Sequence, residues 1–71
     1  MAEPQIYKNR NLSIYHKDTV SFKGGSVCSA HVMIKPGVVT PEFDMVGGIG
    51  DTEKAAEDDA FRRARALIDY N

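Results

Sequence analysis

Hydrophobic and polar positions alternate with a period of two in the first part of the chain, and this alternation predicts β-strands that are buried on one face. Residues 11–16 alternate around Leu12 and Ile14 and form the first predicted strand. Residues 26–35 give the clearest pattern, because one face of that strand carries only apolar side chains. These are Cys28, Ala30, Val32 and Ile34. A third strand is expected at about residues 40–46.

Glycine, proline and short polar runs separate these strands. Residues 19–23 also alternate, but the glycines that follow Lys23 end the pattern, so we interpret this segment as a loop or a short edge strand. Pro36 and the glycine after it predict a turn, and the glycine-rich run 47–50 predicts a flexible connector. Residues 1–5 are expected to be disordered.

A single amphipathic helix is expected from Thr52, which can cap its N-terminus, to about Tyr70. Apolar side chains recur along one stripe of this helix, whereas charged side chains occupy the opposite face. The stripe consists of Ala56, Ala60, Ala64, Leu67 and Ile68, with Phe61 at its edge. Small alanine side chains allow a helix to lie close to a sheet, so the stripe should face the strands.

Together these elements predict an α+β domain with a three-stranded antiparallel sheet, in the order β-β-β-α, and one C-terminal helix packed on one face. Residues 1–71 are interpreted as a single domain with a thin core. We expect Phe43 and Met45 of the third strand to join Val32 and Ile34 beneath the helix. A domain this small has little core to spare for a deep cavity, which disfavours an enzyme.

Charge is distributed unevenly, although the net charge is only −1. Residues 1–35 carry five basic and two acidic side chains, whereas residues 36–71 carry four basic and eight acidic ones. Proteins that bind nucleic acid usually have a basic excess, so the composition disfavours this class. Within the helix, acidic residues precede basic ones, which suits the helix dipole and predicts ion pairs four residues apart. The predicted pairs are Asp58–Arg62 and Asp59–Arg63.

The single cysteine, Cys28, excludes an internal disulfide and argues against a small secreted domain. We expect it to pack beneath the helix as a small hydrophobic side chain. No apolar run in the sequence is long enough to span a membrane, and residues 1–5 lack the apolar centre of a signal peptide. The expected location is therefore a bacterial cytoplasm, with no membrane partner.

Patterns that could support catalysis are incomplete. The glycine-rich run 47–50 precedes a helix, as in phosphate sites, but it lacks the Gly-Lys-Ser/Thr ending of a P-loop and leads into Asp51. Ser29, His31 and Asp44 contain the groups of a hydrolytic triad. Residues two apart on a strand are separated by about 6–7 Å, however, which is too far for a direct bond between serine and histidine.

Metal ligands are also scattered. Cys28 and His31 are expected on opposite faces of one strand, and His16 is the other soft ligand in the sequence. We therefore expect no catalytic residues, no metal and no cofactor.

The sheet face that the helix does not cover is the best candidate for a binding surface. Tyr15, His31 and Met33 are expected there, and aromatic, imidazole and thioether groups on an uncovered sheet suit partner binding. The other interpretation is an ordinary solvent-exposed face. We expect a non-enzymatic domain that binds an unknown protein through this face, as a monomer or a weak dimer. The alternative function is weak binding of RNA or other nucleic acid through the basic first half and the same face.

The C-terminal half resembles small bacterial proteins of unknown function. The similarity lies in Gly50-Asp51-Thr52-Glu53-Lys54-Ala55-Ala56, followed by Ala60, Arg62-Arg63-Ala64 and Ile68-Asp69. Those proteins are single β-β-β-α domains, and the resemblance extends over most of the chain from Ile6 onward. It implies a fold but no known activity.

The same half resembles two better-understood families more loosely. Double-stranded-RNA-binding domains end in β-β-β-α and place lysines at the start of the last helix to contact phosphate. Aligning Thr52 with the serine that opens their motif matches Lys54 to one lysine and puts Glu53 at the other. HicB-type antitoxins share the Gly-Asp-Thr pattern at the start of a helix, but they normally add a DNA-binding segment that has no counterpart here.

Overall fold

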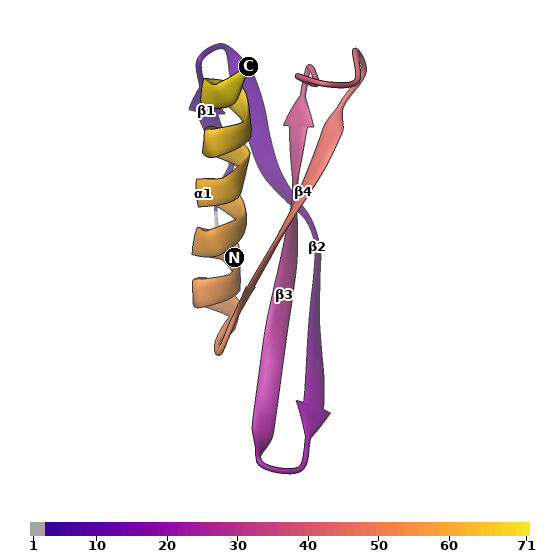
Figure 1. The fold of residues 1–71 in the computed structure, drawn as a ribbon, viewed down its shortest axis with the longest axis vertical. Helices are drawn as coiled ribbons and strands as arrows, with labels where there is room; N and C mark the ends of the chain where they lie inside the picture. The colour runs from indigo at the N-terminus through magenta and orange to yellow at the C-terminus, as the bar shows by residue number, and fades with distance from the viewer. Residues whose placement is uncertain (1–2) are drawn as a thin grey trace.

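The computed structural model describes residues 3–71 as a four-stranded antiparallel sheet with one helix packed on one face (Figure 1). The strands are β1 (Gln5–Tyr7), β2 (Arg10–Phe22), β3 (Gly25–Lys35) and β4 (Asp44–Gly50), and they lie in this order across the sheet. Helix α1 (Glu53–Tyr70) follows β4 directly. The expected α+β class with one C-terminal helix is confirmed, but the sheet has four strands where the sequence pattern predicted three.

The extra strand, β1, comes from the segment before the first predicted strand. Its three residues pair with the start of β2, from Gln5 opposite Leu12 to Tyr7 opposite Arg10. A tight turn with positive φ at two non-glycine residues, Lys8 and Asn9, joins the two strands. A strand of three residues is too short to show a period, so the pattern could not reveal it. Of the segment expected to be disordered, Gln5 lies in this strand, and residues 1 and 2 lie outside the described residues.

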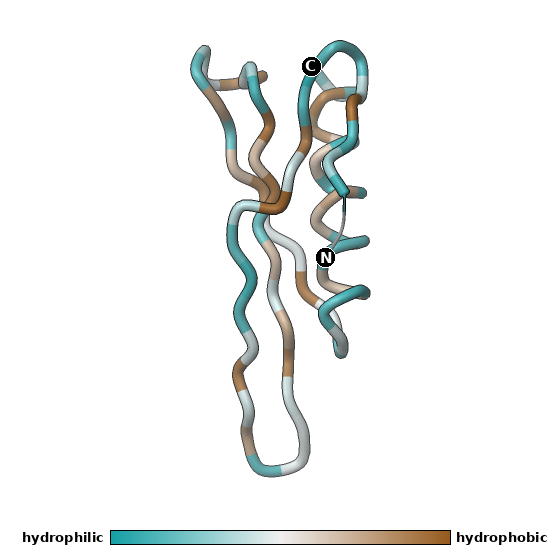
Figure 2. The backbone as a smooth tube through the Cα atoms, turned by 180° about the vertical axis from the view of Figure 1, so that it is seen from behind, coloured by the Kyte–Doolittle hydropathy of each residue, from teal (hydrophilic) through white to brown (hydrophobic). Residues whose placement is uncertain are grey.

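Strands β2 and β3 form one long hairpin. Residues 19–23, interpreted as a loop or a short edge strand, belong largely to β2, which runs without a break to Phe22. Gly24, with φ of 106°, makes the turn. Seen from behind in Figure 2, this hairpin continues well beyond the N-terminal end of the helix. We call its uncovered end, residues 20–27, the arm.

Strand β4 includes the glycine-rich run 47–50, so the predicted flexible connector is wrong. Gly48 pairs with Ala30 and Gly50 with Cys28, on the face that the helix covers. A Cβ atom at Gly48 would lie 2.3 Å from the backbone nitrogen of Ala60, so only glycine leaves room for the helix there. The glycines therefore mark close packing of strand and helix instead of flexibility.

The strand predicted at residues 40–46 begins only at Asp44, because the preceding segment is a loop closed by that residue. The Asp44 carboxylate accepts hydrogen bonds from the backbone N–H groups of Val38, Val39 and Thr40. Burial of this carboxylate would raise its pKa, but the three N–H donors outweigh burial and lower the pKa below its ordinary value. Arg10 secures the loop from β2, donating to the carbonyl oxygens of Pro36 and Gly37 at 2.8 Å.

The helix agrees with the prediction. Thr52 caps it, and its side chain accepts a hydrogen bond from the backbone N–H of Ala55 at 3.1 Å. The alanine stripe is fully buried against the sheet. The core consists of Leu12, Cys28, Ala30, Val32, Ile34, Ala56, Ala60, Phe61, Ala64 and Ile68. Cys28 is buried and free, as expected.

Two packing predictions are wrong. Phe43 and Met45 do not lie beneath the helix: they are 42% and 40% exposed, and Val46 packs against the core instead. Because Gly48 must face the helix, alternation along β4 turns Met45 to the other side. On the charged face of α1, Asp59 pairs with both Arg62 and Arg63, whereas Asp58 pairs with Lys54 and not with Arg62.

Candidate protein-binding face

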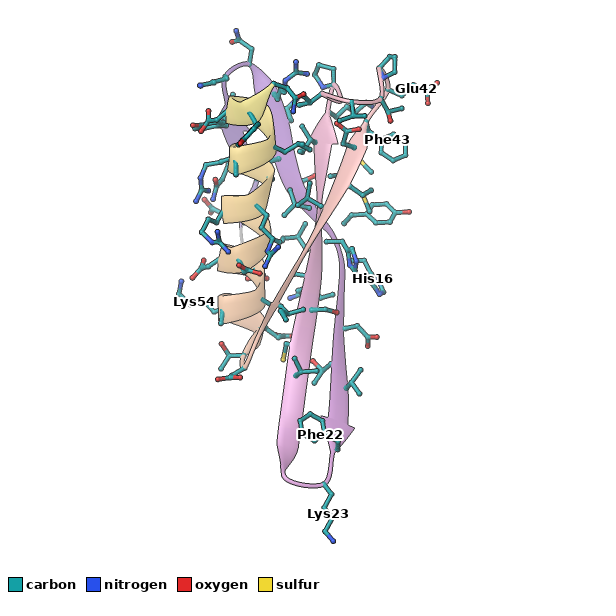
Figure 3. All side chains as sticks on the ribbon, in the orientation of Figure 1. His16, Phe22, Lys23, Glu42, Phe43 and Lys54 are labelled. Atoms are coloured by element: carbon teal, nitrogen blue, oxygen red, sulfur yellow. The ribbon has the colours of Figure 1, made fainter. Side chains whose placement is uncertain are left out.

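The side of the sheet opposite α1 is a continuous surface to which three strands contribute, and we call it the open face. Most of its members follow from the strand register, because directly paired residues point to the same side of a sheet. Tyr15 is assigned by alternation with Ile14, and Phe43 directly precedes β4. The members are Asn11, Ser13, Tyr15, His16, Asp18, Val20, Phe22, Gly25, Val27, Ser29, His31, Met33, Lys35, Phe43, Met45, Gly47 and Ile49. Figure 3 shows two of them, His16 and Phe43, pointing away from the helix.

The three residues singled out by the sequence lie together on this face. His31 and Met33 alternate with buried residues of β3 and are half-buried, and Met33 pairs with Met45 across the sheet. Tyr15 lies at an irregularity in β2, between Ile14 and His16, and is 65% exposed. The register places His31 and Met33 on one face, and Tyr15 lies beside them at the bulge without a directly paired partner.

A β-bulge adds His16 to the group. The register slips by one residue between Ile14, opposite Val32, and His16, opposite His31. Strict alternation would have turned His16 toward the helix, but the extra residue turns it to the open face. Its ring centroid lies 6.0 Å from that of His31, with the ring planes tilted by 42°.

The imidazole of His31 packs over a glycine of the neighbouring strand. A Cβ atom at Gly47, directly opposite on β4, would lie 3.4 Å from the imidazole of His31. The imidazole thus packs closely over bare backbone. Its Nδ1 atom is buried and has no hydrogen-bond partner among residues 3–71.

Large apolar side chains dominate the exposed part of this face. Phe22 and Val20 of the arm are 59% and 56% exposed, and Ile49 at the end of β4 is 62% exposed. Sequence reasoning missed these members because it interpreted residues 19–23 and 47–50 as irregular. The signal for the arm was present, since Val20 and Phe22 do alternate with polar neighbours.

The bulge also turns Lys17 to the helix side, where it meets the N-terminal half of α1. Its Nζ atom lies 3.5 Å from Oε2 of Glu57 and 3.9 Å from Oε2 of Glu53. Glu57 is 7% exposed and was not expected in the core. Lysine therefore compensates a buried carboxylate, which is costly to leave without a cation.

The catalytic and metal arrangements considered from the sequence are not brought together. Asp44 pairs with Ile34 on the helix side and binds the loop, away from the face that carries Ser29 and His31. Cys28 lies beneath the helix, where it accepts a hydrogen bond from Thr19 at 3.3 Å. Among residues 3–71, no three side chains of His, Cys, Asp or Glu are grouped as a metal site would require.

A hollow lies where β4 diverges from the C-terminal half of α1. It has a volume of about 480 Å³ and is open to solvent. Its lining is mainly apolar and consists of Met45, Val46, Gly47, Arg63, Ala66, Leu67 and Tyr70. At the other end of β4, the strand edge is protected from pairing with another strand, because the Ile49 N–H donates to Asp59 of the helix at 3.1 Å.

Comparisons with known proteins do not assign this chain to a family. Within the part of the chain that the structure describes, α1 is not apolar enough to cross a membrane. The chain matches no protein-family model, and neither curated proteins nor solved structures give a match.

Proposed function

We propose that this chain is a small non-enzymatic binding domain whose open face binds a partner protein. The observation that supports this proposal is the group of large apolar side chains that the fold leaves uncovered on one side. Apolar patches of this kind on small proteins mark interaction surfaces. They are Tyr15, Val20, Phe22, Phe43, Met45 and Ile49, each at least 40% exposed.

The chemistry of the open face favours a protein over other partners. Interface cores are enriched in aromatic residues and methionine and are depleted in charge. The register places two charged side chains on this face, Asp18 and Lys35, beside three aromatic side chains and two methionines. The half-buried Met33 and His31 provide a centre that a partner can desolvate fully.

Weak binding of nucleic acid, the alternative function, gains less support. Three of the five basic side chains in residues 1–35 make contacts within the chain. Lys8 pairs with Asp69 at 2.6 Å, Arg10 binds loop carbonyl groups, and Lys17 faces Glu57. A protein that binds phosphates needs free cations along one surface.

Site-specific photocrosslinking tests the proposal. A photoreactive phenylalanine analogue at position 15 should form adducts with a protein in an extract of the source cells, whereas the same analogue at position 70 should not. Tyr70 is the matched control, because it is 93% exposed but lies on the helix. Excess wild-type chain should abolish the adduct, and an Ile49→Asp variant should compete poorly. Equal adducts at both positions would contradict the proposal.

The nucleic-acid alternative has its own measurement. We expect fluorescence anisotropy with duplex and single-stranded RNA to give no affinity tighter than high micromolar at physiological salt. Sub-micromolar binding that weakens steeply with added salt would favour the alternative function.

We also propose a cytoplasmic location for the domain. The argument is that Cys28 is a free thiol buried in the core, as is common in proteins of reducing compartments. Detection of the chain in the soluble fraction of the source cells, with no portion secreted, is the expected result.

A further inference from the structure

The solvent-open hollow beside α1 results from the way in which β4 and the helix diverge. Gly48 and Gly50 hold the first half of the helix against the strand, because Cβ atoms there would meet Ala60 and Ala56. Toward the C-terminal end of the helix the strand moves away from it (Figure 1). The hollow that remains has a volume of about 480 Å³ and a mainly apolar lining. Small-molecule sites have volumes of about 300–1,000 Å³ and linings of this kind with a few polar groups.

Apolar side chains from both elements line the hollow and are left uncovered. Val46 and Leu67 are half-buried, Met45 is 40% exposed and Tyr70 is 93% exposed. From Arg63 to Tyr70, the helical residues at its two ends, the helix rises by about 10 Å. An apolar group of about this length would therefore cover the lining from one end to the other.

Arg63 is the one charged residue in this lining. Its Nε atom donates to Asp59 at 2.9 Å, and its two terminal nitrogen atoms have no hydrogen bond with other residues of the range 3–71. A guanidinium group matches the geometry of a carboxylate and forms strong, charge-assisted hydrogen bonds with it. The charge of the hollow therefore favours a ligand that carries a carboxylate.

The edge of β4 adds a backbone donor beside Arg63. The Ile49 N–H points away from β3, because it donates to the Asp59 carboxylate at 3.1 Å. Alternation along an antiparallel strand turns the N–H of Gly47, which lines the hollow, to the same side. Asp59 thus shows how a carboxylate is held by a β4 N–H and Arg63 together. One step along the strand, a ligand carboxylate would meet the same two kinds of donor.

The open stretch of the β4 edge is too short to favour an added strand. Asp59 occupies the Ile49 N–H at one end, and at the other end β4 begins at Asp44, whose carboxylate binds the preceding loop. Within β4 this leaves Met45 and Gly47 with outward backbone groups. A peptide that extends a sheet gains its affinity from a row of main-chain hydrogen bonds. A compact ligand therefore matches the hollow better than an extended peptide does.

We propose that this hollow binds a small amphipathic carboxylic acid whose apolar body is about 10 Å long. The carboxylate lies between the Arg63 guanidinium group and the Gly47 N–H, and the apolar body lies against Leu67 and Tyr70. This site is additional to the open face, and the inference does not rest on the binding of a partner protein there.

Titration of the full chain with octanoate, followed by the amide signals in NMR spectra, tests the site. We expect saturable shifts at Gly47 and Leu67 and none at Val20 of the arm. The dissociation constant should be about 1 mM or less, as for a ligand of about ten non-hydrogen atoms. Octanol has the same chain without the charge and should bind about tenfold more weakly. Absence of saturable shifts, or equal affinities for octanoate and octanol, would overturn the inference.

Two neighbouring arginines provide matched variants. Arg62 and Arg63 both pair with Asp59, but Arg63 alone lines the hollow. Arg63→Gln should raise the dissociation constant for octanoate by about tenfold, whereas Arg62→Gln should leave it unchanged. Equal losses in the two variants would show that octanoate responds to the general charge of the helix and would reject the site.

A variant at an exposed lining position tests the location of the carboxylate. Ala66 lies three residues after Arg63, so the carboxylate of Ala66→Glu can pair with that arginine and compete with the ligand. Octanoate binding should be lost in this variant, and unchanged binding would contradict the proposal. A blocked peptide with one glutamate and apolar residues is the competing probe. If it displaces octanoate and binds about tenfold more tightly, the occupant is a protein segment and the inference is wrong.

Discussion

At the scale of single residues, two glycines in β4 set the distance between the sheet and the helix. Gly48 and Gly50 face α1, and Cβ atoms there would lie 2.3 Å and 2.6 Å from atoms of the helix. Gly47, between them, faces the open side, where a Cβ atom would be in ordinary contact with His31. Adjacent glycines of β4 therefore have different roles: Gly48 and Gly50 leave room for the helix, whereas Gly47 contacts His31 on the open face.

Gly48→Ala should destabilise the fold, because the added methyl group meets the backbone of Ala60. We expect a loss of about 1–3 kcal/mol in the free energy of unfolding, as for other overpacked cores. Gly47→Ala is the matched control and should be neutral or slightly stabilising, since it also reduces the entropy of the unfolded chain. Urea unfolding of both variants measures the difference. Equal stabilities would show that the helix is not seated on Gly48.

The buried carboxylate of Glu57 gives a second prediction at this scale. Lys17→Met should lower the free energy of unfolding by about 1–3 kcal/mol, because Glu57 then lacks its cation. The double variant with Glu57→Met should recover much of the loss. Lys54→Met, which removes the exposed pair with Asp58, should cost only a few tenths of a kcal/mol. Urea midpoints for the four chains decide whether Lys17 compensates Glu57.

At the scale of elements, Asp59 ties the edge of β4 to the helix. Its carboxylate accepts the Ile49 N–H of the strand and also binds Arg62 and Arg63 of α1. These hydrogen bonds favour the ionised form and lower the pKa of Asp59 to about 2, with the backbone donor contributing most. The same contacts block a free edge that could otherwise pair with another strand.

This linkage predicts a pH dependence of stability. The pKa of Asp59 is about 2 in the folded state and about 3.9 in an unfolded chain, so its contribution is complete above pH ~4 and is lost as the pH falls toward 2. Asp59→Asn should therefore be less stable than the wild type at neutral pH, and the difference should shrink over this window. Urea midpoints at several pH values measure it. A difference that stays constant down to pH ~2 would be inconsistent with an ionised Asp59 at the strand edge.

At the scale of the whole molecule, the chain consists of a layered body and a projecting arm. The body has the helix on one side of the sheet, with Leu12, Val32 and Ile34 fully buried between them. In the arm the two strands have water on both sides, and residues 20–26 are all exposed. The body provides the stability that holds the arm, and the arm extends the open face.

Hydrogen exchange should separate these two parts. At low protein concentration, amides of arm residues such as Val20 and Val27 should exchange by local opening, well before amides of Leu12 and Val32. NMR-detected hydrogen exchange measures the difference. Arm amides as protected as those of the body at low concentration would argue against separate stabilities.

The sequence by itself determined the elements whose hydrophobic pattern repeats over many residues. The alternation of residues 26–35 and the alanine stripe that begins at Ala56 each depend on local geometry, so the strand, the helix and their buried faces could be predicted. The shared face of His31 and Met33 followed from the same alternation. These features need no knowledge of what the chain packs against.

Only the tertiary structure decided the features that arise from pairing. The bulge beside His16 depends on the register between β2 and β3, and one extra residue reverses which side chains face the helix. The strand character of residues 47–50 depends on the approach of α1, because glycine is required there by contact and not by local flexibility. The extent of the open face, from Phe22 to Phe43, could therefore not be predicted from the sequence, because it depends on how the strands pair.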